Sequence, residues 1–205
     1  MKMQTMKRAI RQRIIADREQ LPANLRMQFS SGIAQRILQM PVYQAARTVL
    51  GYMSFGAEFV SDSLMQQVLA DGKQLLLPKV NLDRNELDLY RVTDLQHDLA
   101  PGLWGIREPL REQCVRVDTL GEVDFALLPG VAFGRDGARL GYGGGFYDKL
   151  LARINDEDGT HRPALVAAAY TMQIVAGIPQ EDTDRKVEWL VTESETIECG
   201  KCGRD

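Results

Sequence analysis

The feature of the sequence that most restricts the fold is a strand, a helix and a second strand that follow one another within about thirty residues. Residues 48–54 and 74–78 are short apolar runs of the kind that form buried strands. Between them, Ser61 or Asp62 can cap a helix with apolar residues at helical spacing. This order of elements predicts a right-handed parallel βαβ unit.

The rest of the chain continues the alternation. Residues 124–128 and 164–170 are further apolar strand candidates, and residues 188–192 are a final short one. Residues 86–92 are more amphipathic and predict an exposed strand, whereas residues 101–109 contain too much Gly and Pro for regular structure. Together these patterns predict one α/β domain with a mostly parallel sheet, which binds ligands beyond the carboxyl ends of its strands.

The first forty residues predict two helices, over residues 3–19 and 23–39. Residues 1–26 carry seven Lys or Arg and two Asp or Glu, a charge of +5, so the net charge of −3 leaves −8 for the remainder. Lys7 and Arg11 lie one helical turn apart on a shared face, where they are either solvated or bound to an anion. Because the segment lacks interleaved aromatic residues, a local anion is favoured over nucleic acid.

Composition narrows the class of protein. The chain has 205 residues, 44% hydrophobic and 26% charged, which is ordinary globular usage. It contains no apolar stretch long enough to span a bilayer and no secretory signal, so we expect a cytoplasmic protein. Three cysteines are an odd number and argue against a disulfide framework. Residues 199–205, which include Cys199 and Cys202, predict a polar tail after a domain of residues 1–198.

Four glycines, Gly141, Gly143, Gly144 and Gly145, lie between a strand-like run and a short helical pattern over residues 146–154. A glycine loop that opens a helix directs unpaired N–H groups at one point, where the helix dipole favours negative charge. Such a loop favours phosphate binding, although the glycine spacing fits neither the dinucleotide fingerprint nor the P-loop. From spacing alone, a nucleotide site and a structural turn both remain open.

Charged residues flank the glycine loop. Arg139 before it and Lys149 after it can add cationic donors, and Asp148 offers the hard oxygen that Mg²⁺ prefers. The sequence shows no Ser-His-Asp, Cys-His or metalloprotease pattern. Backbone amides, cations and a carboxylate suit phosphoryl transfer, in which positioning and charge neutralisation provide most of the rate.

The segment Arg-Leu-Gly-Tyr-Gly-Gly-Gly-Phe-Tyr-Asp at residues 139–148 resembles the signature of the 5-formyltetrahydrofolate cyclo-ligases. Weaker motifs of that family follow the expected order over nearly the whole chain. They are Lys-Arg-Ala-Ile-Arg at residues 7–11, Glu58 after the first strand, Leu-Leu-Pro ending at residue 78, Trp-Gly-Ile-Arg-Glu-Pro at residues 104–109, and Thr-Asp-Arg-Lys-Val at residues 183–187.

The resemblance implies a fold and a reaction. The fold is a single three-layer α/β/α domain with a mostly parallel central sheet, similar to the NagB/RpiA/CoA transferase folds. The reaction is the ATP- and Mg²⁺-dependent conversion of 5-formyltetrahydrofolate to 5,10-methenyltetrahydrofolate, with release of ADP and phosphate. ATP phosphorylates the formyl oxygen, and N10 then closes the ring as phosphate leaves. Such an enzyme acts in folate one-carbon metabolism as a monomer on small molecules, with no nucleic acid or membrane partner.

The resemblance also implies roles for individual residues. Arg139, Tyr142 and Asp148 are the predicted catalytic residues, and Asp148 and Asp184 the predicted Mg²⁺ ligands. Met53, Glu58, Trp104 and residues 142–146 are the predicted folate contacts. The predicted ATP contacts are Lys7, Arg8, Ala9, Ile10, Arg11, Arg139, Leu140, Gly141, Tyr142, Gly143, Gly144, Gly145, Phe146 and Tyr147.

Two departures from the family pattern lie in the glycine loop. Many members carry Lys or Arg where this chain has Tyr142 and Gly144, so some cationic stabilisation is absent or supplied from elsewhere. Phe146 replaces a frequent Tyr and lacks its hydroxyl. A folate or nucleotide binder without catalysis, and a nucleic-acid binder that uses the basic first helix, are the rival hypotheses.

Overall fold

A computed structural model describes residues 2–118, 121–156, 162–181 and 184–200. Its centre is an eight-stranded sheet in the order β12-β11-β10-β7-β1-β2-β3-β6. The inner pairings are parallel and the outer ones antiparallel. The parallel strands are β1 (Thr48–Leu50), β2 (Gln74–Asn81), β7 (Phe125–Leu127), β10 (Ala164–Ala168) and β11 (Trp189–Val191); the outer ones are β3 (Glu86–Val92), β6 (Val115–Val117) and β12 (Thr196–Glu198).

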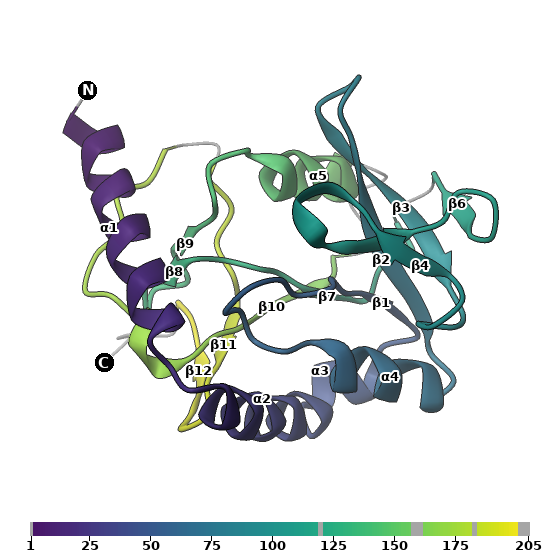
Figure 1. The fold of residues 1–205 in the computed structure, drawn as a ribbon, viewed down its shortest axis with the longest axis horizontal. Coiled ribbons are helices and arrows are strands. Elements are labelled where there is room, and N and C mark those ends of the chain that lie inside the picture. Colours follow the sequence, from purple (N-terminus) through teal and green to yellow (C-terminus); the bar gives the residue numbers. More distant parts are fainter. Residues whose placement is uncertain (1, 119–120, 157–161, 182–183, 201–205) are drawn as a thin grey trace.

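Helices cover both faces of this sheet, as Figure 1 shows. On one face lie α2 (Ala23–Leu38), α3 (Pro41–Ala45) and α4 (Asp62–Ala70), and on the other lies α5 (Phe146–Asp156). Neighbouring strand residues alternate between the two cores: Val49 packs with the α2–α4 side and Leu50 with the α5 side. Strands buried on both faces read as continuous apolar runs. The predicted α/β fold with a mostly parallel central sheet is confirmed.

The first helix, α1 (Lys2–Glu19), lies along one end of the sheet, beside the two-stranded β8 (Ala132–Phe133) and β9 (Arg139–Leu140) (Figure 1). Its Ile14 is buried in a small cluster with Val131, Ala132 and Leu140. Both N-terminal helices were predicted within two residues of their ends. Part of the polar surface of α1 is therefore turned toward the loop that follows β9.

Two predictions of local structure were wrong. The strand at residues 86–92 was expected to be exposed, yet most of β3 is buried, because it pairs along its length with β2 and lies against α5. Residues 101–109 were expected to be irregular. They form part of a hairpin of β4 (Leu99–Pro101) and β5 (Arg107–Pro109) around the 3₁₀ turn η1 (Leu103–Gly105). Gly and Pro at the turn and the strand ends are compatible with so short a ladder.

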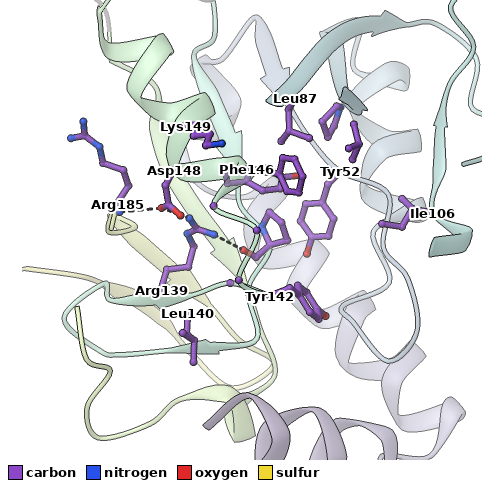
Figure 2. A pocket seen from close by; sticks show the side chains of 18 of the residues that line it. Tyr52, Leu87, Ile106, Arg139, Leu140, Tyr142, Phe146, Asp148, Lys149 and Arg185 are labelled. Carbon is purple, nitrogen blue, oxygen red and sulfur yellow. Dashed lines mark hydrogen bonds and ion pairs between the residues drawn. The ribbon is translucent and has the colours of Figure 1, made fainter. Parts of the chain in front are cut away.

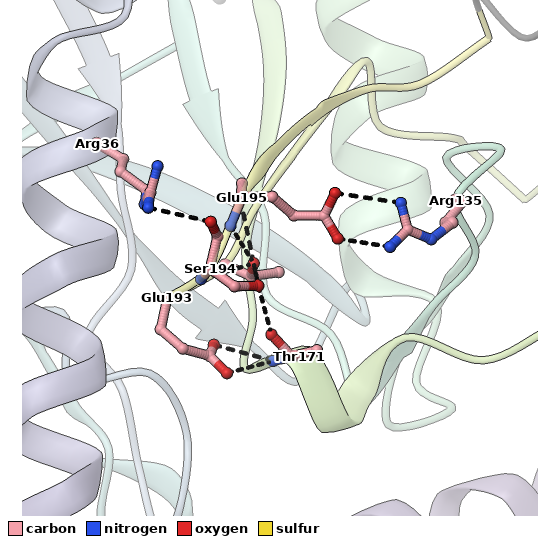
Figure 3. A network of polar contacts seen from close by, with 7 residues as sticks. Arg36, Arg135, Thr171, Glu193, Ser194 and Glu195 are labelled. Atoms are coloured by element: carbon pink, nitrogen blue, oxygen red, sulfur yellow. Dashed lines mark hydrogen bonds and ion pairs between the residues drawn. The ribbon is translucent and has the colours of Figure 1, made fainter.

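A polar network closes the turn between β11 and β12 (Figure 3). Glu193 accepts hydrogen bonds from the Thr171 N–H, and the Ser194 carbonyl accepts one from Arg36 of α2. Arg135, from the β8–β9 connection, pairs with Glu195. These contacts fix the end of the sheet that lies next to α2. Among the described residues, no helix is long and apolar enough to cross a lipid bilayer.

Candidate active site

The glycine loop connects β9 to α5 and forms one wall of a cavity of about 990 Å³. The other walls come from α1, the segment after β1, the hairpin at η1, and the chain around Asp184. Of the predicted site residues, those that line this cavity are Lys7, Arg11, Met53, Glu58, Trp104, Arg139, Leu140, Gly141, Tyr142, Gly143, Gly144, Gly145, Phe146, Tyr147, Asp148 and Asp184. The fold thus gathers these predicted residues from five separate parts of the sequence into one pocket.

The backbone of the glycine loop is open to a ligand. No hydrogen bond joins the N–H groups of residues 141–145 to any other residue that the structure describes. Gly143 and Gly145 have φ angles of +111° and +67°, a region of backbone conformation that residues with a side chain rarely adopt. The loop therefore needs glycine at these positions and presents unpaired donors to the cavity.

Two ion pairs flank the loop. Arg139 donates to Asp148, with 2.6 Å between Nη2 and Oδ1, and Lys7 donates to Asp184, with 2.8 Å between Nζ and Oδ2. Figure 2 shows the Arg139 and Asp148 side chains pointing toward each other below α5. Burial by itself would raise the pKa of Asp184, but hydrogen bonds from Lys7 and the Glu181 N–H, with the charges of Lys7 and Arg139, outweigh it and lower that pKa.

Helical periodicity decides which α1 residues reach the cavity. Lys7 and Arg11 line it, and Arg11 Nε donates to the Gly141 carbonyl at 2.7 Å. Arg8 and Ala9 are exposed, and Ile10 packs with the Ile14 cluster. These three were predicted as ATP contacts, but they do not line the pocket, since a 3.6-residue period turns them onto other faces of the helix.

Across the cavity, Glu58 is the centre of a second group of polar contacts. Its side chain is buried, and it accepts hydrogen bonds from the Tyr142 hydroxyl at 2.7 Å and the Phe55 N–H at 3.2 Å. Burial raises the pKa of Glu58, while these hydrogen bonds and the Arg18 charge oppose the rise. The pKa of Tyr52 is also raised, by burial and by the nearby Glu58 charge. This half of the pocket can pair a carboxylate with donor groups of a heterocycle.

Met53 and Trp104 complete that half of the cavity. Met53 is buried in the core cluster on the α2–α4 side and also lines the pocket. Trp104 lies in η1 with φ +58° and is 65% exposed, so its ring is open to an incoming ligand. A non-glycine residue at positive φ is uncommon and is found more often at ligand-binding turns.

The residues present fit both a polyphosphate and a divalent cation. Arg139 lines the same pocket as the unpaired amides, and its buried Nε has no hydrogen-bond partner among the described residues, so the guanidinium and the amides together suit an anion. Asp148 and Asp184 line that pocket, while nowhere in the described ranges do three or more potential ligands gather. Two carboxylates fit Mg²⁺ held jointly with phosphate and water, as opposed to an all-protein cage.

The sequence interpretation missed Arg18 and Tyr52. Arg18 falls on the same face of α1 as Lys7, Arg11 and Ile14, and its Nη2 donates to the Tyr142 hydroxyl at 2.7 Å. The spacing 7, 11, 14, 18 could have shown this face. Tyr52 gave no such signal, because a tyrosine within an apolar strand-like run is expected to pack in the hydrophobic core. Cys202 and the rest of the predicted tail beyond Gly200 lie outside the described residues, as does Thr183 of the motif at residues 183–187.

Comparison with known proteins decides the family. A profile of the 5-formyltetrahydrofolate cyclo-ligase family matches residues 3–193. The chain belongs to this family. The predicted resemblance is confirmed, and the chain is an enzyme of the folate-linked class that the family name describes.

Individual relatives agree with the family match. The chain is 30% identical over 190 residues to a 5-formyltetrahydrofolate cyclo-ligase of Escherichia coli, covering 92% of this chain and 99% of the relative. It is 29% identical over 191 residues to the one of Mus musculus, covering 91% and 93%. The solved 5,10-methenyltetrahydrofolate synthetase of Aquifex aeolicus superposes with a TM-score of 0.81 at 32% identity, covering 98% of this chain and 95% of the other.

Proposed function

We propose that the chain converts 5-formyltetrahydrofolate to 5,10-methenyltetrahydrofolate with consumption of ATP, in the presence of Mg²⁺. The observation that carries the proposal is a single cavity with two chemically different ends. One end has unpaired loop amides with Arg139, Lys7 and Arg11, which suit phosphates. The other has the buried Glu58 carboxylate under exposed aromatic residues, which suits a pterin ring.

At the phosphate end, the loop amides and the three cations hold the triphosphate of ATP and offset its charge. Arg139 and Lys7 each hold a carboxylate at hydrogen-bonding distance, so phosphate oxygens and Mg²⁺ can take over the two partners of each pair. Asp148 and Asp184 are the proposed metal ligands. Mg²⁺ held there would offset the charge that develops on the phosphate oxygens.

At the folate end, Glu58 accepts hydrogen bonds from the N–H groups of the pterin, and Trp104 and Tyr142 offer aromatic surface to the substrate. The formyl oxygen is a poor leaving group and is first converted to a phosphate ester by attack on the γ-phosphorus, with ADP leaving. N10 then bonds to the formyl carbon and loses its proton, the carbon–oxygen bond breaks, and phosphate departs. The protein mainly aligns the reacting atoms and excludes water.

Both proposed substrates are small molecules, and the proposed reaction needs neither nucleic acid nor a membrane. We place it in the cytoplasm. We propose that the monomer is the working form, which is compatible with a cavity whose two ends are both supplied by one chain.

The test is the growth of methenyl-folate absorbance when the purified protein meets 5-formyltetrahydrofolate, ATP and Mg²⁺. We expect turnover that requires all three and one ADP for each product formed. Omission of ATP, and a variant Lys7→Met that lacks a phosphate cation, are the matched controls. Folded protein that binds folate and ATP in calorimetry without turnover would show a binding protein and contradict the proposal.

A further inference from the structure

Arg18 is a buried cation of α1 that lies outside the predicted site. Arg18 is 3% exposed, and its Nη2 donates to the Tyr142 hydroxyl at 2.7 Å. The guanidinium carbon is 5.8 Å from the centre of the Tyr142 ring. Its Nε is buried with no hydrogen-bond partner in the part of the chain that the structure describes. Arg18 therefore reaches the cavity through Tyr142, because it does not line the cavity itself.

The contact continues to Glu58. The Tyr142 oxygen accepts from Arg18, so its single proton is left to donate to Glu58 Oε1 at 2.7 Å. The other carboxylate oxygen of Glu58 accepts from the Phe55 N–H, and the Phe55 ring packs against Tyr142 with 5.2 Å between ring centres. Arg18, Tyr142 and Glu58 form a chain of hydrogen bonds from the first helix to the folate end of the cavity.

Fold stability is a poor reason for this arrangement. Burial of a guanidinium without a directly bonded carboxylate costs desolvation free energy. An apolar side chain of similar volume would usually make the fold at least as stable. The direction of the hydrogen bonds offers a different reason: it gives the Tyr142 hydroxyl one orientation and holds Glu58 by both oxygens. A carboxylate held in this way has a fixed orientation before the ligand binds, so less conformational freedom is lost on binding.

We propose that Arg18 is a positioning residue of the reaction, which orients Tyr142 and through it the Glu58 carboxylate toward the folate. The inference rests on the proposed function, because that function assigns Glu58 to the pterin. It also gives α1 a second task. Lys7 and Arg11 of this helix face the phosphate end of the cavity, and Arg18 acts at the folate end, so one helix supports both substrates.

The test compares Arg18→Gln, Tyr142→Phe and the double variant with the wild type, varying folate and ATP separately. Arg13→Gln, an exposed arginine of the same helix, is the matched control. For Arg18→Gln we expect kcat/KM for 5-formyltetrahydrofolate to fall about tenfold or more, as for loss of a hydrogen bond to a charged group, and KM for ATP to stay within about twofold. The double variant should be no worse than Tyr142→Phe alone, because either change cuts the same chain.

A second readout is the pH profile of kcat/KM for folate. The guanidinium opposes the rise in the pKa of Glu58, so its loss should move the acidic limb of the profile to higher pH. A purely structural role of Arg18 would not move that limb. Arg13→Gln should leave both readouts unchanged.

Several outcomes would overturn the inference. One is a folded Arg18→Gln with unchanged kcat/KM for folate. Another is a double variant in which the effects of the two single variants multiply. The third is an equal fall in kcat/KM for folate and for ATP. If Arg18→Gln does not fold, Arg18→Lys replaces it in the same cycle, with the same criteria. A wild-type protein without turnover removes the proposed function itself, whereas active wild type with an unaffected Arg18 variant removes this inference alone.

Discussion

Replacing Asp148 by Asn tests the ion pair at the centre of the phosphate end. Asn keeps the size of the side chain and one hydrogen-bonding oxygen but removes the charge that faces Arg139. The Arg139 side chain is 3% exposed and that of Asp148 is 27% exposed. Breaking a fully buried pair costs about 3–5 kcal/mol, and the partial exposure of Asp148 and the retained oxygen reduce this to about 2 kcal/mol. For a domain of this size, that lowers Tm by about 4–8 °C.

The same change should alter the response to anions. Without the carboxylate, the buried charge of Arg139 has no partner, so a phosphate becomes its best available one. We expect inorganic tripolyphosphate without metal to raise the Tm of Asp148→Asn more than that of the wild type, while turnover with ATP and Mg²⁺ falls by about a hundredfold or more. Differential scanning fluorimetry and the methenyl-folate assay measure the two effects.

Asp136→Asn is the matched control, because Asp136 pairs with Lys186 at 2.6 Å but both side chains are about half exposed. An exposed pair contributes about 0–1 kcal/mol, so this variant should keep both its Tm and its activity. The reasoning is refuted if Asp148→Asn matches the wild type in Tm and turnover, or if tripolyphosphate stabilises the variant and the wild type equally.

Three further predictions concern other parts of the molecule. The pKa of Glu58 is raised above 4.5, so its ionisation costs folding free energy, and stability is lost as pH rises from about 4.5 toward the folded-state pKa. Glu58→Gln should remove this loss, and unfolding of both proteins measured between pH 4 and 8 will show it. Gly137→Ala should destabilise the fold by about 1–3 kcal/mol in denaturant unfolding, since φ is +86° and the new Cβ would stand 2.2 Å from the Val187 carbonyl oxygen. Trp104→Leu should raise KM for folate about tenfold by loss of aromatic contact, without affecting KM for ATP.

Each of these has an outcome that would contradict it. A constant Tm difference between wild type and Glu58→Gln across the pH range would mean that the carboxylate is not penalised by burial. For Gly137, the control is Gly32→Ala in α2, where nothing lies within 4 Å and alanine should stabilise the helix; equal effects of the two substitutions would disprove the steric argument. Unchanged folate kinetics in Trp104→Leu would show that this ring serves no substrate.

The sequence by itself determined the layers of the fold and the identity of the loop. Apolar runs at residues 49–50, 75–77 and 125–127 are continuous because each strand is buried on both faces there, and that pattern depends on local composition. The glycine loop is visible in the sequence because four glycines lie within residues 141–145, and glycine is the residue that tolerates the φ angles such a loop needs. Such signals lie within a few neighbouring residues, so no knowledge of the three-dimensional structure is needed to read them.

The tertiary structure alone decided which side chains meet. Burial of β3 depends on its pairing with β2 and its packing against α5, which an amphipathic pattern at residues 86–92 cannot reveal. Arg18 contacts Tyr142 across 124 positions of the chain, and Lys7 contacts Asp184 across 177. Docking of α1 beside the β9–α5 loop creates both contacts. Their physical origin is the packing of Ile14 against Leu140, a contact between distant segments that no local pattern encodes.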